Sequence, residues 1–214
     1  MKLNTKKTAI ILIIIAALGL SYPKWSGMFE SAPSVDPTEV DNIAAHIKGP
    51  ADAEYTLVEF SDFQCEACEK ALSFVATVMG IYPDQLNLEY RHLPLRYIHK
   101  NADIAARASE AAGLQGKFWE MHDKLFEMQS AWGNSVAPKS LFVDYAVELG
   151  MDAELFRADL ENHTIIHHID AHYVQARDLA VTGTPTFFLV SEKNGIELGD
   201  MKITSGKDLE EILK

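Results

Sequence analysis

Residues 56–68 have the sequence TLVEFSDFQCEAC. The run at residues 56–60 is mostly apolar and β-branched, which predicts a short buried β-strand. Cys65 and Cys68 follow after a short turn, and the residues from Glu66 to Val78 have the apolar pattern of a helix. The stretch therefore predicts a strand, a turn and a helix that begins with two cysteines.

Cys65 and Cys68 are the only cysteines of the chain. A structural disulfide usually closes a longer loop, because a longer loop restricts the unfolded chain more. A two-residue spacing instead brings a nucleophilic thiol and a resolving thiol within bonding reach at a helix start, where N–H groups and the helix dipole favour the thiolate. Zinc would need about four ligands, and no second cysteine pair exists. The pair therefore indicates thiol–disulfide exchange, and a module that binds a soft metal such as Cu(I) through these cysteines and a histidine is the alternative.

Two positions outside the cysteine pair are further candidates for the site. Glu59 lies between Val58 and Phe60 on the predicted strand, so burial would raise the pKa of its carboxyl group and allow proton exchange during thiol chemistry. The alternative is a glutamate that emerges at an exposed strand edge. Pro185 begins another predicted strand, at a place where a cis peptide bond can occur.

The rest of the domain predicts further strands around a helical block. The block covers about residues 101–181, with helices expected at 102–113, 118–128, 138–149 and 152–161 and a longer one that ends near Ala180. The elements outside it are a strand at 86–91, a strand at 186–190, a hairpin turn at Asn194-Gly195, a partner strand at 196–203 and a helix at 207–213. The order β-α-β, helical block, β-β-α predicts an α/β fold with a small mixed sheet covered by helices.

In this order, the features resemble the DsbA-like branch of the thioredoxin superfamily. The resemblance rests on the strand with Glu59, the Cys65–Cys68 pair at the head of a helix, the inserted helices with FWEMHDKLF at residues 118–126, and the segment Gly183-Thr184-Pro185-Thr186. It covers about residues 45–214. The fold that it implies is a thioredoxin-like mixed sheet with an inserted helical block.

The resemblance also implies a role for each candidate residue. It makes Cys65 the attacking sulfur, Cys68 its buried partner and Glu59 the buried acid. Pro185 would be a cis-proline that faces the disulfide, and Thr184 would offer its backbone to an extended substrate. We expect no bound cofactor and no metal.

The dipeptide between the cysteines differs from that of many relatives. Strong oxidants of the family often have Pro-His there, whereas this chain has Glu66-Ala67. Because a carboxylate at Glu66 opposes a neighbouring thiolate, we expect the thiol of Cys65 to be less acidified than in those oxidants. The direction of electron flow therefore stays open between an oxidase and a reductase.

The N-terminus predicts export to the periplasm or another extracytoplasmic space. Three lysines within residues 1–7 precede an apolar run of 12 residues from Ala9 to Leu20. This run has the length of a signal-peptide core and is shorter than the roughly 20 residues that span a bilayer. Residues 1–25 are therefore expected to be a cleaved signal peptide or a short anchor that tethers the protein through residues 9–22. No cysteine lies near the run, which excludes lipoprotein processing.

The remaining sequence divides into a linker and one domain. Residues 26–48 contain serine, proline, glycine and scattered acids without strong periodicity, so we expect a linker there and the DsbA-like domain at 49–214. Disulfide isomerases of the same superfamily usually carry an N-terminal dimerisation domain, for which residues 26–48 are too few. We therefore expect a monomeric oxidase or reductase.

Charge narrows the choice of partners. The chain has a formal net charge of −12, and −15 without residues 1–20. Such a domain is repelled by phosphate backbones, which excludes nucleic acid as a partner. The expected partners are exported proteins with thiols or disulfides and a membrane or soluble redox partner. The His163/His167 and His168/His172 pairs have the spacing of metal ligands, but we interpret them as part of a solvated helix face because no H-E-x-x-H acid accompanies them.

Overall fold

A computed structural model describes residues 43–213 of the chain. The expected signal peptide or anchor at residues 1–25 and most of the expected linker lie outside the described residues. Within residues 43–213, no helix is both long enough and apolar enough to cross a membrane.

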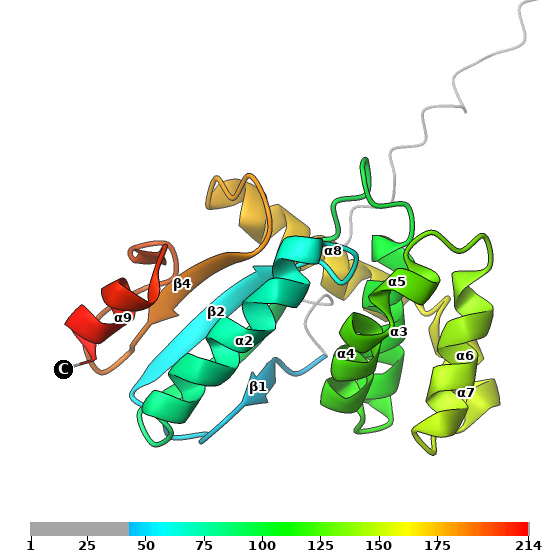
Figure 1. The fold of residues 1–214 in the computed structure, drawn as a ribbon, viewed down its shortest axis with the longest axis horizontal. Coiled ribbons are helices and arrows are strands. Elements are labelled where there is room, and N and C mark those ends of the chain that lie inside the picture. Colours follow the sequence, from blue (N-terminus) through cyan, green and yellow to red (C-terminus); the bar gives the residue numbers. More distant parts are fainter. Residues whose placement is uncertain (1–42, 214) are drawn as a thin grey trace, which may run out of the picture. The chain divides into compact units, whose positions relative to one another are not determined.

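A mixed five-stranded sheet forms the centre of the described domain (Figure 1). In spatial order the strands are β1 (His46–Lys48), β3 (Leu86–His92), β2 (Tyr55–Ser61), β4 (Thr186–Val190) and β5 (Lys202–Ile203). The central strand β2 is parallel to β3 and antiparallel to β4, so that Glu59 lies opposite Tyr90 on one side and Phe187 on the other. The strand that leads to Cys65 is therefore paired along both of its edges.

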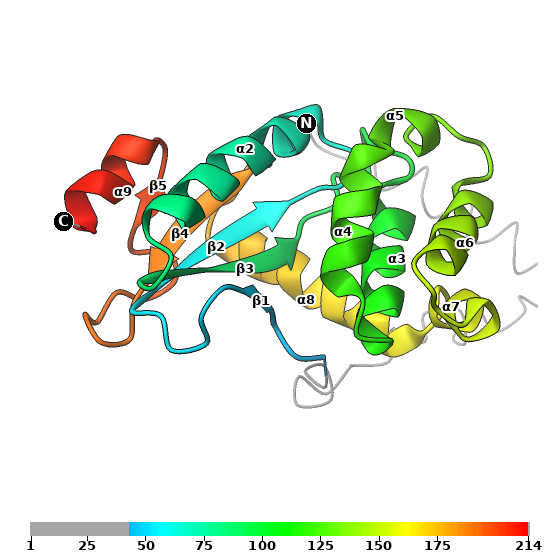
Figure 2. The same ribbon diagram turned by 60° about the horizontal axis from the view of Figure 1, so that its bottom comes forward.

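Helices cover both faces of the sheet, and a helical block lies beside it (Figures 1 and 2). The helix that begins after Cys65, α2 (Glu66–Ile81), lies on one face, and α8 (His163–Asp178) lies on the other. The other helices are α3 (Ala102–Leu114), α4 (Phe118–Glu127), α5 (Gln129–Trp132), α6 (Pro138–Glu148), α7 (Ala153–Asp159) and the C-terminal α9 (Gly206–Ile212). The predicted block of helices over residues 101–181 is confirmed.

The two-residue period of β2 divides its side chains between the two helical layers. Leu57 packs in a cluster with Val75 of α2, whereas Val58 and Phe60 pack in a cluster with Ala176 of α8. Because successive side chains of a strand point to opposite faces, Glu59 lies on the α2 face together with Leu57. This alternation directs the carboxyl group of Glu59 toward the layer that carries the cysteines.

Two predicted boundaries are wrong. The linker was expected to extend to residue 48, but His46–Lys48 forms β1 and pairs with β3, because a three-residue edge strand is too short to produce a periodic pattern. The strand expected at 196–203 is reduced to Lys202–Ile203. After the expected turn, which an isolated Ser191–Ile196 bridge closes, the chain turns again at Gly199, whose φ of 104° favours glycine.

A buried glutamate connects the sheet to the helical block. The side chain of Glu110 on α3 is fully buried, and its carboxylate accepts hydrogen bonds from Nε2 of His46 at 2.9 Å and Nε2 of His92 at 2.6 Å. Burial alone would raise the pKa of Glu110, but these two histidines outweigh it and hold the pKa far below its ordinary value. Glu110 therefore joins β1 and β3 to α3 through charge-assisted hydrogen bonds.

We expect Glu110→Gln to destabilise the fold by about 3–5 kcal/mol, because it breaks a buried ion pair and replaces one of the two acceptor oxygens with an NH2 donor. A lowered carboxyl pKa contributes stability above the ordinary value of 4.5 and loses it as the pH falls further, so only the wild type should show this loss. Urea unfolding at several pH values measures both effects. Glu120→Gln, at an exposed pair with Lys117, is the matched control and should change stability by less than about 0.5 kcal/mol.

Candidate active site

The cysteine pair lies at the start of α2. Cys65 is the N-cap residue and keeps 9% of its surface exposed, whereas Cys68, one turn further, is fully buried. The backbone N–H of Cys65 donates to the carbonyl oxygen of Asp62 at 3.0 Å, which fixes the turn between β2 and α2. Both cysteines are free thiols. The arrangement offers one sulfur to a reaction partner and shields the other.

The two thiols have opposite acidities. A hydrogen bond from the Cys68 thiol is the main reason that the pKa of Cys65 falls to about 5, and the backbone N–H groups of Ala67 and Cys68 contribute to it against the effect of burial. The pKa of Cys68 is raised far above its ordinary value, because Cys68 supplies the proton of that hydrogen bond and is itself buried. At neutral pH the outer sulfur is therefore a thiolate and the inner one a thiol.

The loop before β4 lies against this pair. The Thr184–Pro185 peptide bond is cis, as predicted, and the carbonyl oxygen of Thr184 lies 3.5 Å from Sγ of Cys65. The hydroxyl of Thr186 donates to the carbonyl oxygen of Gly183 at 2.8 Å, which holds the loop at the point where it enters the sheet. The structure thus brings together the two motifs that are 119 residues apart in the sequence.

Glu59 lies in the sheet beneath the cysteines. It is 2% exposed, and burial raises its pKa to about 7. The alternative of an exposed strand edge is wrong, because β2 has a neighbouring strand on each side. Ser61 lies near enough to lower the pKa of both Glu59 and Cys68, although its hydroxyl has no well-formed hydrogen bond among residues 43–213. Ser61 was not predicted as part of the site, although it follows Glu59 by two residues and therefore shares its face of the strand.

Tyr90 is a further buried neighbour that the sequence did not reveal. It lies opposite Glu59 in the β2–β3 register, and burial together with the negative charges of Glu59 and Cys68 raises the pKa of its phenol. Only the pairing of the strands places it there. The neutral phenol ring of Tyr90 is therefore a largely apolar neighbour of the Glu59 carboxyl group.

Cys65 opens onto a groove of about 860 Å³ between the start of α2 and the loops around α3 and α5. Side-chain amides hold its walls. Gln64 donates to the carbonyl oxygen of Gly133 at 2.8 Å and accepts from the backbone N–H of Asn101 at 2.8 Å. Gln129 donates to the carbonyl oxygens of Phe63 and Cys65 at 2.8 and 3.2 Å. The groove is therefore built into the scaffold around the reactive sulfur.

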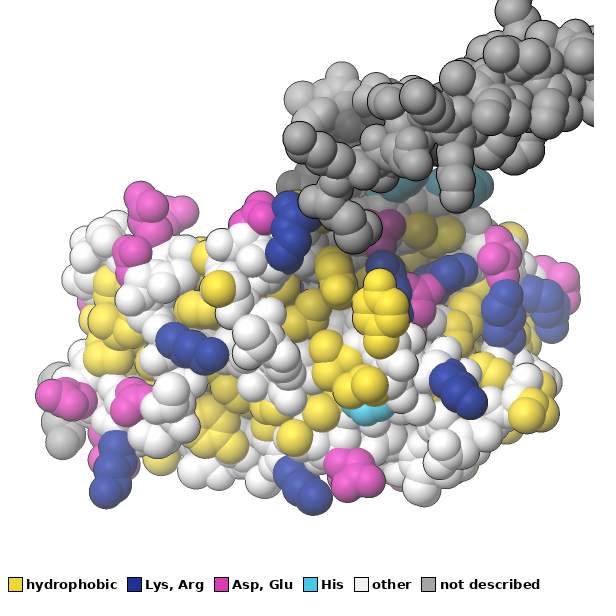
Figure 3. Space-filling model, turned by 90° about the horizontal axis from the view of Figure 1, so that it is seen from above, with side chains coloured by type: hydrophobic (Ala, Val, Ile, Leu, Met, Phe, Trp, Pro, Cys, Tyr) yellow, Lys and Arg dark blue, Asp and Glu magenta, His cyan; other side chains and the backbone are white. Residues whose placement is uncertain are grey.

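The rim near Cys65 exposes apolar side chains. Tyr97 and Ile98, in the loop between β3 and α3, are 97% and 69% exposed, and Ile98 lines the groove. Figure 3 views the protein from above Figure 1, where α2 begins, and shows hydrophobic side chains gathered in the middle of this face with charged side chains scattered around them. Such a surface suits contact with another protein chain.

The Glu66 carboxylate between the two cysteines is turned to solvent. Its side chain is 82% exposed, and it lies 3.8 Å from the ammonium group of Lys70. Both water and this lysine screen its effect on the Cys65 thiolate. Solvent therefore separates the Glu66 carboxylate from Cys65, and the expectation that Glu66 makes the Cys65 thiol less acidic stays a prediction.

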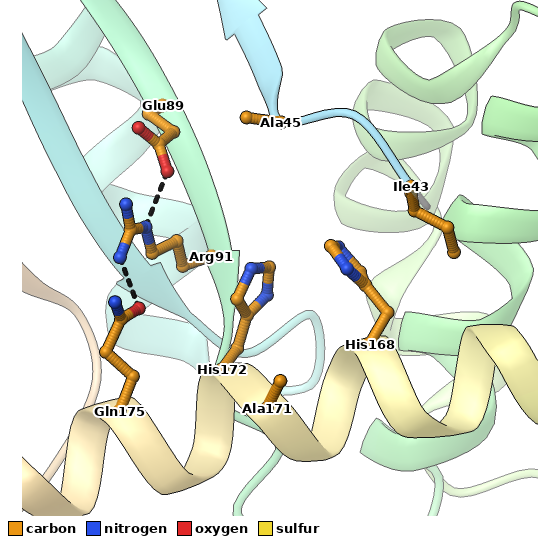
Figure 4. A pocket seen from close by; sticks show the side chains of 8 residues that line it. All are labelled: Ile43, Ala45, Glu89, Arg91, His168, Ala171, His172 and Gln175. Carbon is orange, nitrogen blue, oxygen red and sulfur yellow. Dashed lines mark hydrogen bonds and ion pairs between the residues drawn. The ribbon is translucent and has the colours of Figure 1, made fainter. Parts of the chain in front are cut away.

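The interpretation of the α8 histidines as a solvated face is wrong for His168. It is 3% exposed, and together with His172 it points from α8 into a pocket of about 370 Å³ that Arg91 of β3 also lines (Figure 4). Nδ1 of His172 accepts the backbone N–H of His92 at 3.2 Å, and burial lowers the pKa of His172 well below its ordinary value. Their side chains face inward because α8 packs against β3.

Among residues 43–213, no group of three or more histidine, cysteine or acidic side chains is arranged to hold a metal ion. The described residues therefore do not provide the histidine that the Cu(I) alternative requires beside Cys65 and Cys68.

The fold and the site define a thioredoxin-like protein with an inserted helical block. Comparison with known families agrees: the model of the DSBA-like thioredoxin domain matches residues 56–212, and the chain belongs to this family. A thioredoxin-like oxidoreductase from Silicibacter pomeroyi DSS-3 is a similar solved structure, with 26% identity, a TM-score of 0.64, and coverage of 83% of this chain and 95% of the other. The predicted fold class is thus confirmed.

Two further solved structures share the fold at lower identity. BdbD from Bacillus subtilis is 21% identical with a TM-score of 0.64 and covers 78% of this chain and 89% of its own. DsbA2 from Pseudomonas aeruginosa is 22% identical with a TM-score of 0.62 and covers 79% and 93%. At these identities the likeness concerns the fold alone.

Curated relatives match a part of much longer proteins. The Na(+)/H(+) antiporter NhaA of Herminiimonas arsenicoxydans is 37% identical over 166 residues, which are 78% of this chain and 25% of that protein. NhaA 1 of Mycolicibacterium vanbaalenii is 40% identical over 157 residues, which are 71% of this chain and 23% of that protein. The chain spans about a quarter of the length of the curated relatives it matches.

The acidity of Cys65 can be tested by alkylation of the reduced protein. We expect iodoacetamide to modify Cys65 and not Cys68, with a rate that rises through a midpoint near pH 5. Cys68→Ala removes the donor to the Cys65 thiolate, so the midpoint should move to higher pH. Mass spectrometry of the modified peptide identifies the sulfur. Equal labelling of both cysteines in the wild type would contradict the assignment, and Cys65→Ala serves as the control for background labelling.

Proposed function

We propose that this protein is a thiol–disulfide oxidoreductase that exchanges disulfides with exported proteins through Cys65 and Cys68. The observation that carries the proposal is the pair of unequal thiols: an outer sulfur with a pKa of about 5 and a buried partner whose pKa is raised. Exchange proceeds through thiolates, so this pair is poised to react at one sulfur and to resolve at the other.

The reaction has two steps that run in either direction. When the protein acts as an oxidant, a substrate thiolate attacks Sγ of Cys65, forms the mixed disulfide and releases Cys68 as a thiolate. A second substrate thiolate then attacks the substrate sulfur of that mixed disulfide, and Cys65 leaves as the stable thiolate. A low pKa of Cys65 makes it a good leaving group in this second step.

Glu59 is proposed to supply and accept the proton of Cys68. Its pKa of about 7 means that its carboxyl group is partly protonated at neutral pH, which suits a group that both gives and takes a proton. Ser61, which influences the pKa of both residues, offers a hydroxyl between them. Proton transfer to Cys68 would otherwise require water to enter a fully buried site.

The Thr184–Pro185 loop is proposed to bind the substrate. The carbonyl oxygen of Thr184 already approaches Cys65, and an extended substrate segment can form main-chain hydrogen bonds with this edge. Recognition by main-chain groups tolerates many sequences, which suits an enzyme that acts on several proteins. The exposed Tyr97 and Ile98 would add apolar contact at the rim.

The proposal places the protein outside the cytoplasm, with a membrane or soluble protein as its redox partner. The basic and apolar segment within residues 1–20 supports export, as a cleaved signal or as a tether. Ion transport is not proposed, because the match to the antiporters covers only about a quarter of their length and this chain carries a DSBA-like domain there.

The proposed function is tested with the full chain and a dithiol peptide. The oxidised protein should convert the peptide to its disulfide form, and Cys65→Ala should abolish the reaction. Because the Cys65 pKa of about 5 lies between about 7 for thioredoxin and about 3.5 for DsbA, we expect a reduction potential between about −270 and −120 mV. Equilibration with glutathione measures it, and Glu66→His should shift it toward the oxidising end. An oxidised protein that does not react with the peptide would exclude the function.

We expect Glu59→Gln to slow the formation of the mixed disulfide by about 10²-fold at neutral pH, because Cys68 then lacks its proton donor. The same change should stabilise the protein. A carboxyl pKa raised from 4.5 to about 7 costs stability as the pH rises through that interval, by about 3 kcal/mol in total. Glutamine abolishes this loss. Stopped-flow rates and urea unfolding at pH 4.5 and 8 measure the two effects, and Glu89→Gln on β3 is the control for the loss of a strand carboxylate.

A further inference from the structure

A second acid lies close to the cysteine pair, in the turn between β2 and α2. The side chain of Asp62 is fully buried. One of its oxygens accepts the backbone N–H of Gln64 at 2.7 Å, and the other accepts the backbone N–H of Leu95 at 2.9 Å. The backbone carbonyl of Asp62 accepts the N–H of Cys65. Asp62 therefore fixes both the turn that carries Cys65 and the start of the loop after β3.

His99, in that loop, is bound to the same carboxylate. Its Nδ1 lies 2.7 Å from Oδ2 of Asp62. Because a carboxylate accepts hydrogen bonds, Nδ1 is the donor, and in the neutral tautomer of the ring this leaves the lone pair on Nε2. The His99 side chain is 22% exposed, and it lines the groove together with Cys65. Within residues 43–213, no hydrogen bond involves Nε2 of His99, so this nitrogen is available to a molecule in the groove.

The contacts of Asp62 indicate that His99 is not needed to satisfy the carboxylate. Two backbone N–H groups already bind it, one to each oxygen. His99 has one ring nitrogen fixed by a buried acid, and its side chain is partly exposed and lines the groove, which suits a histidine that transfers protons.

We propose that His99 transfers the proton of the substrate thiol in the groove in front of Cys65, with Asp62 as the residue that positions its ring. The inference rests on the proposed function, which it extends from the cysteines to the substrate. It gives each reacting sulfur outside the thiolate of Cys65 its own group for proton transfer: Glu59 for the buried Cys68, and His99 for the sulfur of the substrate.

The step is balanced in protons and electrons. In the oxidising direction, Nε2 of His99 takes the proton of the substrate thiol as the substrate sulfur attacks Sγ of Cys65. The new S–S bond forms, the Cys65–Cys68 bond breaks, and Cys68 leaves with the electron pair and receives a proton from Glu59. In the reducing direction, protonated His99 returns a proton to the substrate thiolate as it leaves Cys65.

Several charged groups surround His99 and will influence its protonation. Asp62 is hydrogen-bonded to Nδ1 of the ring. The start of α2 contributes charged side chains to the same groove: Glu66, Glu69 and Lys70. Lys100 follows in the chain and is exposed, and Arg96 in the same loop is engaged by Asp103 and Asp170. The ammonium group of Lys70 lies beside the carboxylate of Glu66 and offsets its charge. The carboxylate in direct contact with His99 is that of Asp62.

The test compares two thiols that differ in the need for proton removal. The oxidised full chain is mixed with an alkanethiol, which is protonated at pH 6, and with a nitro-substituted aromatic thiol, whose thiol group is acidic enough to be ionised at that pH. The variants are His99→Gln, whose amide can still donate to Asp62, and Asp62→Asn. His167→Gln is the matched control, because His167 is a half-buried histidine of α8 outside the groove. The readouts are the stopped-flow rate with each thiol and the alkylation pKa of Cys65.

We expect His99→Gln to slow the reaction with the alkanethiol by about 10²-fold, near the lower end of general acid–base catalysis, and to leave the rate with the aromatic thiol and the Cys65 pKa unchanged. Asp62→Asn should cause a smaller loss with the same selectivity. His167→Gln should behave as the wild type. An equal loss with both thiols, or none with either, in His99→Gln would overturn the inference. A wild type that reacts with neither thiol would instead overturn the proposed function.

Discussion

The site depends on the enclosure of strand β2. This strand has a neighbour on each edge and a helical layer on each face, so every side chain between Leu57 and Ser61 is removed from water. Three polar groups lie on or directly after it: Glu59, Ser61 and Asp62. Their burial alters the chemistry of each, because a buried acid must either become neutral or find donors. Glu59 becomes partly neutral, whereas Asp62 finds two backbone N–H groups and a histidine.

Glu59 and Asp62 thus lie in opposite kinds of surroundings, although they are only three residues apart. Glu59 is surrounded mainly by apolar groups and a phenol, which favour its protonated form. Asp62 lies in the turn, where the chain no longer uses all of its N–H groups in the sheet and can offer them to a carboxylate. The cysteine pair lies just beyond both. The end of β2 therefore places, within seven residues of the chain from 59 to 65, a buried carboxyl group with a raised pKa, a carboxylate held by hydrogen bonds and the outer cysteine.

Much of this could be predicted from the sequence, where the signal was local. The strand at 56–60, the helix after Cys65 and the helical block follow from apolar patterns, and the place of Pro185 follows from its position before a strand. The missing parts depend on contacts between distant residues. His99 and Asp62 are 37 residues apart, and the sequence around neither residue predicts their hydrogen bond. The sequence predicts a solvated face for His168 because no acid accompanies the α8 histidines in an H-E-x-x-H arrangement, and only the packing of α8 on β3 shows that His168 is buried.

The way in which the groove walls are attached has an evolutionary consequence. Gln64 and Gln129 hold the walls by hydrogen bonds to backbone groups of Gly133, Asn101, Phe63 and Cys65, and a backbone group is present whatever side chain stands at a position. Residues that face the groove, such as Ile98 and Ser130, can therefore be exchanged without loss of these attachments. A lineage that duplicates such a domain could change which proteins it recognises by drifting at the lining, while the chemistry of the sulfur pair is inherited unchanged.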